Sequence, residues 1–209
     1  MQNRNIVSLV VVSLIGLSSA GCALETLDQA PDVDETVSES EAAHRSLCPA
    51  DVPAALTPDP DQTLKGIVNA VGAQVYVCTS TPSSPTPAWT FMAPQANLLA
   101  DNGRLLGTHF IGPTWQDNDG SSVQGSKLAG ATVDGTAIPW LLLKATTHAG
   151  DGYFSDVTSI QRLSTVGGNA PSTGCDAEHL GAISQVPYSA EYAFYKTKTR
   201  GKVVQCKVK

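Results

Sequence analysis

The sequence has little charge and no apolar run long enough to cross a membrane. Of its 209 residues, 15% are charged, and the net charge at pH 7 is -6. Between Arg45 and Tyr195, six residues are basic and twelve are acidic. This balance leaves no basic patch for a phosphate backbone, so we expect no nucleic-acid partner. The apolar run at residues 6–17 is shorter than the roughly 20 residues of a membrane-spanning helix.

The motifs of several enzyme and metal-binding classes are also missing. No GxGxxG follows a strand, which argues against a dinucleotide-binding fold, and "GSSVQG" at residues 120–125 lacks the G-x-S-x-G spacing of a hydrolase elbow. The four histidines are scattered and no CxxC is present, so no compact zinc site is expected. The "DNDG" turn at residues 117–120 lacks the flanking ligands of an EF-hand. We therefore expect no metal and no cofactor.

The N-terminal segment has the layout of a secretory signal peptide over residues 1–21. Arg4 precedes the apolar run, and small residues follow it. Ser19, Ala20, Gly21 and Cys22 then resemble a bacterial lipobox, in which the cysteine becomes the lipidated first residue of the mature chain. Two outcomes stay open: lipidation at Cys22, or ordinary cleavage that releases a secreted protein. Both place the protein outside the cytoplasm.

The remaining chain divides into an acidic tether and one domain. Residues 25–41 contain seven acids, no Lys and no Arg, so they cannot bury enough apolar surface to fold, and we expect a disordered tether over residues 22–46. Residues 47–209 are long enough for one domain with its own core. The domain ends in the basic stretch 196–209, which is either a solubilising edge hairpin or a contact for anionic lipid, lipopolysaccharide or the tether.

The local patterns of the domain are those of β-strands. Residues 73–80, 88–92 and 186–195 alternate in hydrophobicity, and the last of these places Val186, Tyr188, Ala190, Tyr192 and Phe194 on one face. Turn sequences recur at residues 101–103, 117–121, 134–136 and 149–152. Residues 138–149 are expected to form a buried strand, and residues 175–184 the one short helix. These patterns predict an all-β fold, an antiparallel β-sandwich or barrel of about eight to ten strands.

After Cys22, four cysteines remain: Cys48, Cys78, Cys175 and Cys206. An even number in an exported chain predicts two disulfides, and spacing alone leaves all three connectivities open.

Six ordered motifs resemble one known family. They are "GAQVYVC" at residues 72–78, "W-x-F-x-x-P-x-A-x-L" at 89–98, "GTHFIGPTWQDNDGSSVQG" at 107–125, "IPWLLLKA" at 138–145, "VTSIQRLSTVGGNAPSTGCD" at 157–176 and "VPYSAEYAFY" at 186–195. Together they are similar to the domain-of-unknown-function 3455 family of exported bacterial and fungal proteins. The resemblance brings no activity, cofactor or catalytic residue. It does place Cys78 and Cys175 on family motifs, which implies a Cys78–Cys175 bridge and a Cys48–Cys206 bridge joining the ends of the domain.

The stretch at residues 109–123 is the best candidate for a site. If Phe110 lies in the core, His109 points outward, and the break at Gly112-Pro113 can return Trp115 beside it. We expect His109, Trp115 and Asp119 to line one pocket with Arg162, a cation in a strand of low charge. The alternative is that Asp119 caps its turn, His109 bonds locally and Trp115 covers the barrel end.

Three classes of function follow from these residues. The first is an exported, lipid-anchored envelope or surface protein, expected to be a monomer, whose β-domain binds a saccharide or a small polar ligand. Its membrane contact would be through the lipid alone. The second is a secreted hydrolase or lyase that uses His109 with Asp119. The third is a purely structural envelope protein.

Overall fold

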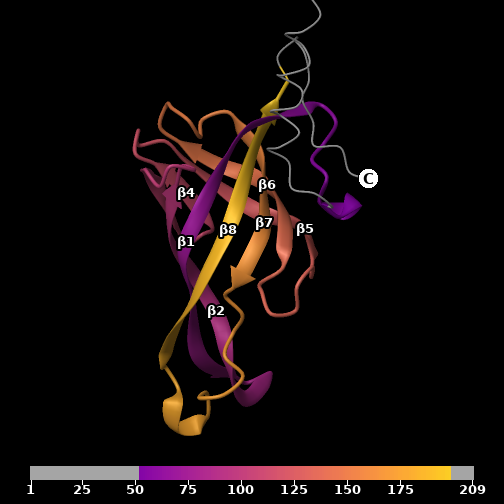
Figure 1. The fold of residues 1–209 in the computed structure, drawn as a ribbon. Helices are drawn as coiled ribbons and strands as arrows, with labels where there is room; N and C mark the ends of the chain where they lie inside the picture. The colour runs from indigo at the N-terminus through magenta and orange to yellow at the C-terminus, as the bar shows by residue number, and fades with distance from the viewer. Residues whose placement is uncertain (1–51, 199–209) are drawn as a thin grey trace, which may run out of the picture.

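The chain folds into a closed antiparallel barrel, in which every strand pairs with the next along the sequence and the last pairs with the first. The computed structural model describes residues 52–198, which Figure 1 shows in colour. The strands are β1 (Gln62–Thr81), β2 (Ser84–Leu99), β3 (Leu105–Phe110), β4 (Thr114–Asp117), β5 (Ser122–Ala131), β6 (Trp140–Ala149), β7 (Val157–Gly167) and β8 (Ile183–Thr197). The all-β prediction is confirmed, and of its two architectures the structure has the barrel.

Short turns produce this simple order of strands. The four turn sequences predicted at residues 101–103, 117–121, 134–136 and 149–152 each fall between consecutive strands. Gly103 and Gly120 have φ values of 80° and 88°, a region that glycine occupies without a steric penalty. Antiparallel neighbours need only such tight connections, so no helix has to cross the sheet.

The short helix predicted over residues 175–184 is a single 3-10 turn, η2 (Ala177–His179). Asp176 caps it, because its side chain accepts hydrogen bonds from the backbone N–H groups of Glu178 and His179. Gly181, with a φ of 85°, then turns the chain into β8. A second 3-10 turn, η1 (Ala54–Leu56), precedes β1. No helix within residues 52–198 is long and apolar enough to span a membrane.

The core fills the inside of the barrel. As predicted for β8, Tyr188, Ala190, Tyr192 and Phe194 are buried on one face, whereas Val186 of the same predicted face is only half-buried. They pack with large side chains of the other strands, among them Leu98, Trp115, Phe154 and Ile160. A smaller cluster lies outside the barrel, where Val52 and Leu56 cover Leu142, Leu163 and Tyr195. Residues 138–149, predicted as a buried strand, are half-buried and belong to both clusters through Leu143 and Leu142.

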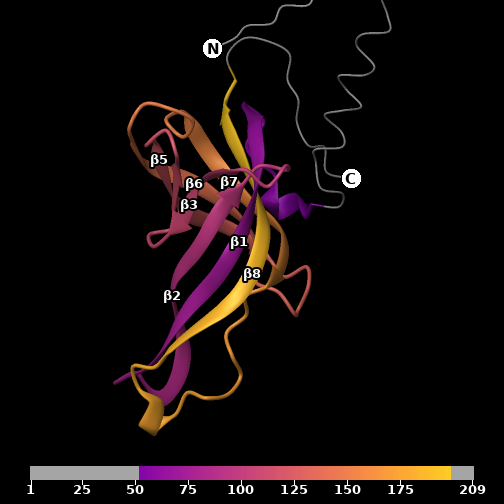
Figure 2. The same ribbon diagram turned by 60° about the vertical axis from the view of Figure 1, so that its left-hand side comes forward.

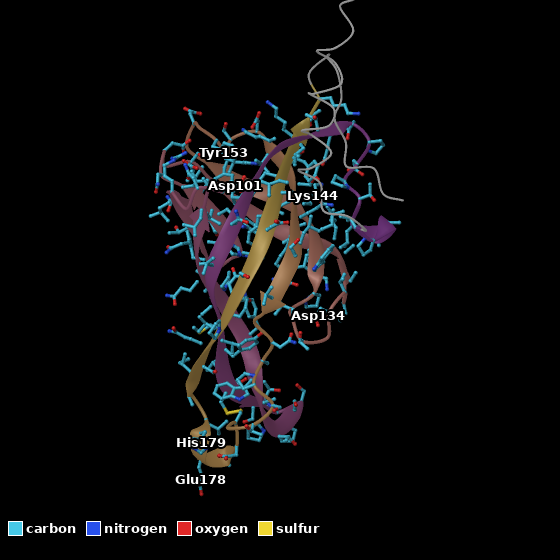
Figure 3. All side chains as sticks on the ribbon, viewed as in Figure 1. Asp101, Asp134, Lys144, Tyr153, Glu178 and His179 are labelled. Carbon is cyan, nitrogen blue, oxygen red and sulfur yellow. A yellow bond between two sulfur atoms is a disulfide. The ribbon has the colours of Figure 1, made fainter. Side chains whose placement is uncertain are left out.

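Three strands continue beyond the barrel as a long twisted arm. β2 pairs with β1 back to Ser84 but with β3 only from Ala96 onward, so the first part of β2 lies outside the barrel. Figures 1 and 2 show β1, β2 and β8 extending together away from the other strands. Glu178 and His179 lie at the tip of this arm, whereas Asp101 and Tyr153 are at the opposite end of the molecule (Figure 3).

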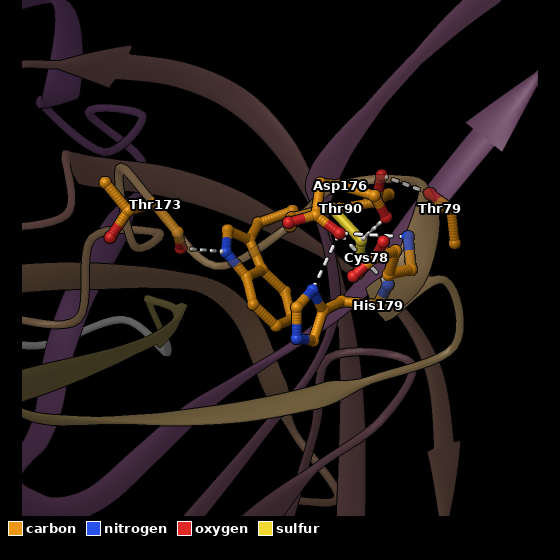
Figure 4. The surroundings of a disulfide bond; sticks show 9 residues. Cys78, Thr79, Thr90, Thr173, Asp176 and His179 are labelled. Atoms are coloured by element: carbon orange, nitrogen blue, oxygen red, sulfur yellow. Dashed lines mark hydrogen bonds and ion pairs between the residues drawn. A yellow bond between two sulfur atoms is a disulfide. The ribbon is translucent and has the colours of Figure 1, made fainter.

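A disulfide fastens the tip of the arm. Cys78 in β1 is bonded to Cys175 with a Cα–Cα distance of 5.3 Å, which confirms this predicted pair. Beside it, the indole Nε1 of Trp89 donates to the carbonyl oxygen of Thr173 at 2.8 Å (Figure 4). Several predictions concern residues outside the described part of the chain. They are the Cys48–Cys206 bridge, lipidation of Cys22, the signal peptide, the tether and the basic tail beyond residue 198.

Candidate functional site

A cavity of about 350 Å³ lies where the arm leaves the barrel. Each of the eight strands contributes at least one residue to its wall, which is mostly apolar. The lining residues are Gln74, Phe91, Pro94, His109, Pro113, Trp115, Gly125, Ser126, Lys127, Leu141, Leu143, Arg162 and Tyr192. Trp115 and His109 are buried, whereas Phe91 is 51% exposed and Ser126 and Lys127 are exposed. The cavity therefore has a buried floor and an exposed rim.

Two stacked rings make the floor. His109 in β3 and Trp115 in β4 are directly opposite in the antiparallel register, so both side chains point to the same face. Their ring centroids are 4.3 Å apart with planes inclined by only 11°. Tyr192 of β8 meets the indole edge-on at 5.2 Å. Trp115 is only 1% exposed and cannot serve as an open platform for a sugar ring.

His109 faces the barrel interior and not the outside, so the outward orientation considered from the sequence is wrong. It is 3% exposed, whereas Phe110, the residue assumed to be in the core, is only partly buried. Gly107 precedes His109 on the same buried face, where a Cβ would collide with the backbone oxygen of Gln116 in β4. His109 Nδ1 lies 2.8 Å from the carbonyl oxygen of Thr114. Burial lowers the pKa of His109 to about 3, so the neutral imidazole donates from Nδ1.

Arg162 lines the cavity from β7 and has a carbonyl as its partner. Its Nε and Nη2 donate to the backbone oxygen of Pro139 at 3.1 Å and 2.8 Å. In the described part of the chain, no carboxylate lies within ion-pair distance of this guanidinium. The neighbouring Gln161 points to the other side of β7, where its side chain donates to the carbonyl oxygen of Leu56.

Asp119 does not line the cavity. Its carboxylate accepts hydrogen bonds from the backbone N–H groups of Ser121 at 2.7 Å and Tyr153 at 2.7 Å. The bonds from Ser121 and then Tyr153 hold the pKa of Asp119 below its usual value. This carboxylate caps its turn and ties it to the β6–β7 loop, so it is not hydrogen-bonded to His109. Of the four residues proposed from the sequence, the structure brings together His109, Trp115 and Arg162.

Several buried polar atoms in and beside the cavity have no hydrogen-bond partner among residues 52–198. They are Gln74 Nε2, Trp115 Nε1 and Tyr192 Oη on the lining residues, and Tyr188 Oη next to them. The two phenols lie near each other and near Gln74 and Arg162, but neither hydroxyl reaches hydrogen-bond geometry. A buried polar group without a partner costs about 1–3 kcal/mol, so such a group is rare in a purely structural core.

Sequence reasoning missed Gln74, Tyr192 and Lys127 as cavity residues. The alternation of residues 73–80 contained a signal for Gln74, because Gln74 and Tyr76 share a face of the strand with the disulfide cysteine Cys78. That face is the buried one, which puts an amide inside the barrel. No group of three or more His, Cys, Asp or Glu residues that could hold a metal ion occurs within residues 52–198.

Fold and cavity together define a closed up-and-down barrel with a cavity whose mostly apolar wall carries a few polar groups. The chain belongs to the family described as "Protein of unknown function (DUF3455)", whose pattern matches residues 58–196. This match confirms the resemblance drawn from the six motifs. Comparisons with curated proteins and with solved structures found no match.

Proposed function

We propose that this protein is an exported binding protein, anchored to the cell envelope through lipid on Cys22, whose barrel takes up a small ligand in the cavity at the base of the arm. The observation that carries the proposal is the set of unpartnered polar atoms on the cavity wall, Gln74 Nε2, Trp115 Nε1 and Tyr192 Oη. Ligand sites in proteins have this composition, a mostly apolar wall with a few polar groups that fix orientation.

The geometry suggests how a ligand would enter and sit. The exposed side chains Phe91, Ser126 and Lys127 form the entrance, and the stacked pair of His109 and Trp115 forms the base. The unpartnered atoms are covered by their neighbours, so uptake includes a small rotation of the Gln74 amide and the Tyr192 hydroxyl toward the ligand. Each new hydrogen bond would satisfy a donor that the protein leaves unpaired.

Hydrolysis or elimination by His109 and Asp119 has less support. A general base needs a pKa near the working pH and a partner that orients it. Burial holds the pKa of His109 at about 3, and Asp119 is engaged by the N–H groups of Ser121 and Tyr153. The cavity lining contains no Asp or Glu that could replace Asp119.

Thermal shift of the full chain against a collection of small sugars, carboxylates, amines and alcohols tests the binding. A ligand that binds only the folded state raises the melting temperature in proportion to the logarithm of its concentration over Kd. In Ser126→Trp, a bulky side chain at the entrance should abolish the shift. The matched control is Ser84→Trp, at an exposed serine of β2 that does not line the cavity. A screen without any shift, or shifts that persist in Ser126→Trp, would refute the proposal.

The anchor is tested separately by metabolic labelling with an alkyne analogue of palmitate in a bacterial host. We expect the label on the wild-type chain and its loss in Cys22→Ala, because the lipobox-like residues 19–22 direct lipid to that thiol. An unlabelled wild-type chain whose mature N-terminus lies beyond Cys22 would show a freely secreted protein instead.

A further inference from the structure

The charges on the cavity wall are all of one sign. Arg162 and Lys127 are the two basic residues of the lining, and no acidic residue is among the thirteen. His109 adds no charge, because burial keeps it neutral at pH values above about 3. An amine or a metal cation entering this cavity would meet uncompensated positive charge, whereas an anion would neutralise it.

Arg162 in particular has a charge that no carboxylate within residues 52–198 balances. The carbonyl oxygen of Pro139 accepts two of its N–H groups but carries no formal charge. The guanidinium also has further N–H groups in a plane, a geometry that matches the two oxygens of a carboxylate. Its electrostatic influence reaches His109, Tyr76, Tyr188 and Tyr192, which places it among the polar groups of the site.

The unpartnered nitrogen atoms give the same indication. The indole Nε1 of Trp115 can only donate a hydrogen bond, and so can the amide Nε2 of Gln74. Both require acceptor oxygens, of which a carboxylate has several. The rest of the wall, including Leu141, Leu143 and Phe91, offers apolar contact and suits the carbon skeleton of a ligand.

We propose that the ligand is a small organic carboxylate with an apolar body, whose carboxylate group is held by Arg162 and whose body lies against the apolar wall. This inference rests on the proposed function, since it names the ligand class of the same cavity. Lys127, exposed at the entrance, attracts the anion, and Arg162 receives it inside.

Two probes of nearly equal shape test the ligand class, 2-naphthoate and the neutral 2-naphthamide. Binding to the full chain is measured by calorimetry and by the change in tryptophan fluorescence. We expect 2-naphthoate to bind about ten- to a hundred-fold more tightly, the gain given by a hydrogen bond to a charged group. Arg162→Gln should remove this preference, whereas Arg162→Lys should keep part of it because the charge remains. Arg104→Gln, at an exposed arginine that does not line the cavity, should leave it intact.

The possible results separate the two proposals. Equal affinity for the two probes, or a preference that Arg162→Gln leaves unchanged, refutes the carboxylate class while the cavity remains a binding site. Failure of both probes, when a neutral compound of the thermal-shift collection does bind, refutes the carboxylate class in the same way. If no compound of either set binds, both proposals fail. An Arg162→Lys variant with the wild-type melting temperature is folded, so a change in its binding preference cannot be caused by unfolding.

Discussion

His109 is a polar side chain that the barrel interior holds without charge. The antiparallel register sets it against Trp115, and Thr114 accepts its one N–H group. The sequence predicted that His109, Trp115 and Arg162 line one pocket. For His109 and Trp115 the signal was the bend at Gly112-Pro113, which returns β4 alongside β3. The sequence was insufficient for Asp119, because a turn carboxylate takes the nearest backbone N–H groups first. It was also insufficient for Tyr192, which comes from a strand about 80 residues away in the sequence and joins the floor only through barrel closure.

Protonation of His109 should destabilise the fold in acid. Its pKa is about 3 in the folded protein and about 6.5 when exposed, so between these values the unfolded state binds more protons. Stability from this group is therefore complete above pH 6.5 and falls with decreasing pH, by up to about 1.4 kcal/mol per pH unit. His109→Gln should reduce the slope of unfolding free energy against pH between about pH 4.5 and 6.5.

The measurement is chemical denaturation at a series of pH values, in which a change of slope is distinct from a uniform loss of stability. Loss of ring stacking in His109→Gln lowers the free energy of unfolding equally at every pH. The slope against pH then depends only on proton binding. His179→Gln, which removes an exposed imidazole at the arm tip together with its ion pair to Asp176, gives the comparison with an exposed histidine. Identical slopes for wild type and His109→Gln would contradict the buried neutral histidine.

Among the structural elements, the strands and turns could be predicted from the sequence, whereas the arm could not. Alternation and turn residues are local signals, and each expected turn separates two strands. The length of β1 was not visible, because its twenty residues pair with β2 on one side and β8 on the other, and such pairing is not encoded within the strand. The expected helix shrank to η2 because Cys175 at its start is fixed by the disulfide and Gly181 ends it.

The Cys78–Cys175 bridge should contribute substantially to stability. It joins residues 97 apart, and restricting an unfolded loop of that length is worth about 4.7 kcal/mol by the chain-entropy argument. The variant with both Cys78→Ala and Cys175→Ala should lose roughly this much free energy of unfolding. Denaturant titration measures it, and limited proteolysis should find new cleavage in residues 169–182, which the bridge fastens to β1. The double variant should no longer respond to reductant. A wild-type unfolding midpoint that reductant leaves unchanged would count against this contribution.

For the whole molecule, strand patterns and turn sequences predicted the all-β fold class. Only the structure shows that the sheet closes into a barrel. A sandwich and a barrel have the same strands and the same hairpins, and they differ in whether the first strand finds the last. Here β1 pairs with β8 from Gln62 opposite Thr197 to Val77 opposite Ile183. Three buried aromatic residues of β8, Tyr188, Tyr192 and Phe194, then fill the interior at the seam.

This seam imposes an order in time. A polypeptide is synthesised from its N-terminus, so β1 is present before β8, and the barrel stays open until the last strand arrives. Contacts between the two ends of a chain are the slowest to form, because a long loop must close before they contribute. The barrel therefore cannot close while the chain is still being synthesised, and Cys78 must likewise wait for Cys175. Because β8 is synthesised last, the cavity with Arg162 on its wall is completed only after the whole domain has been made.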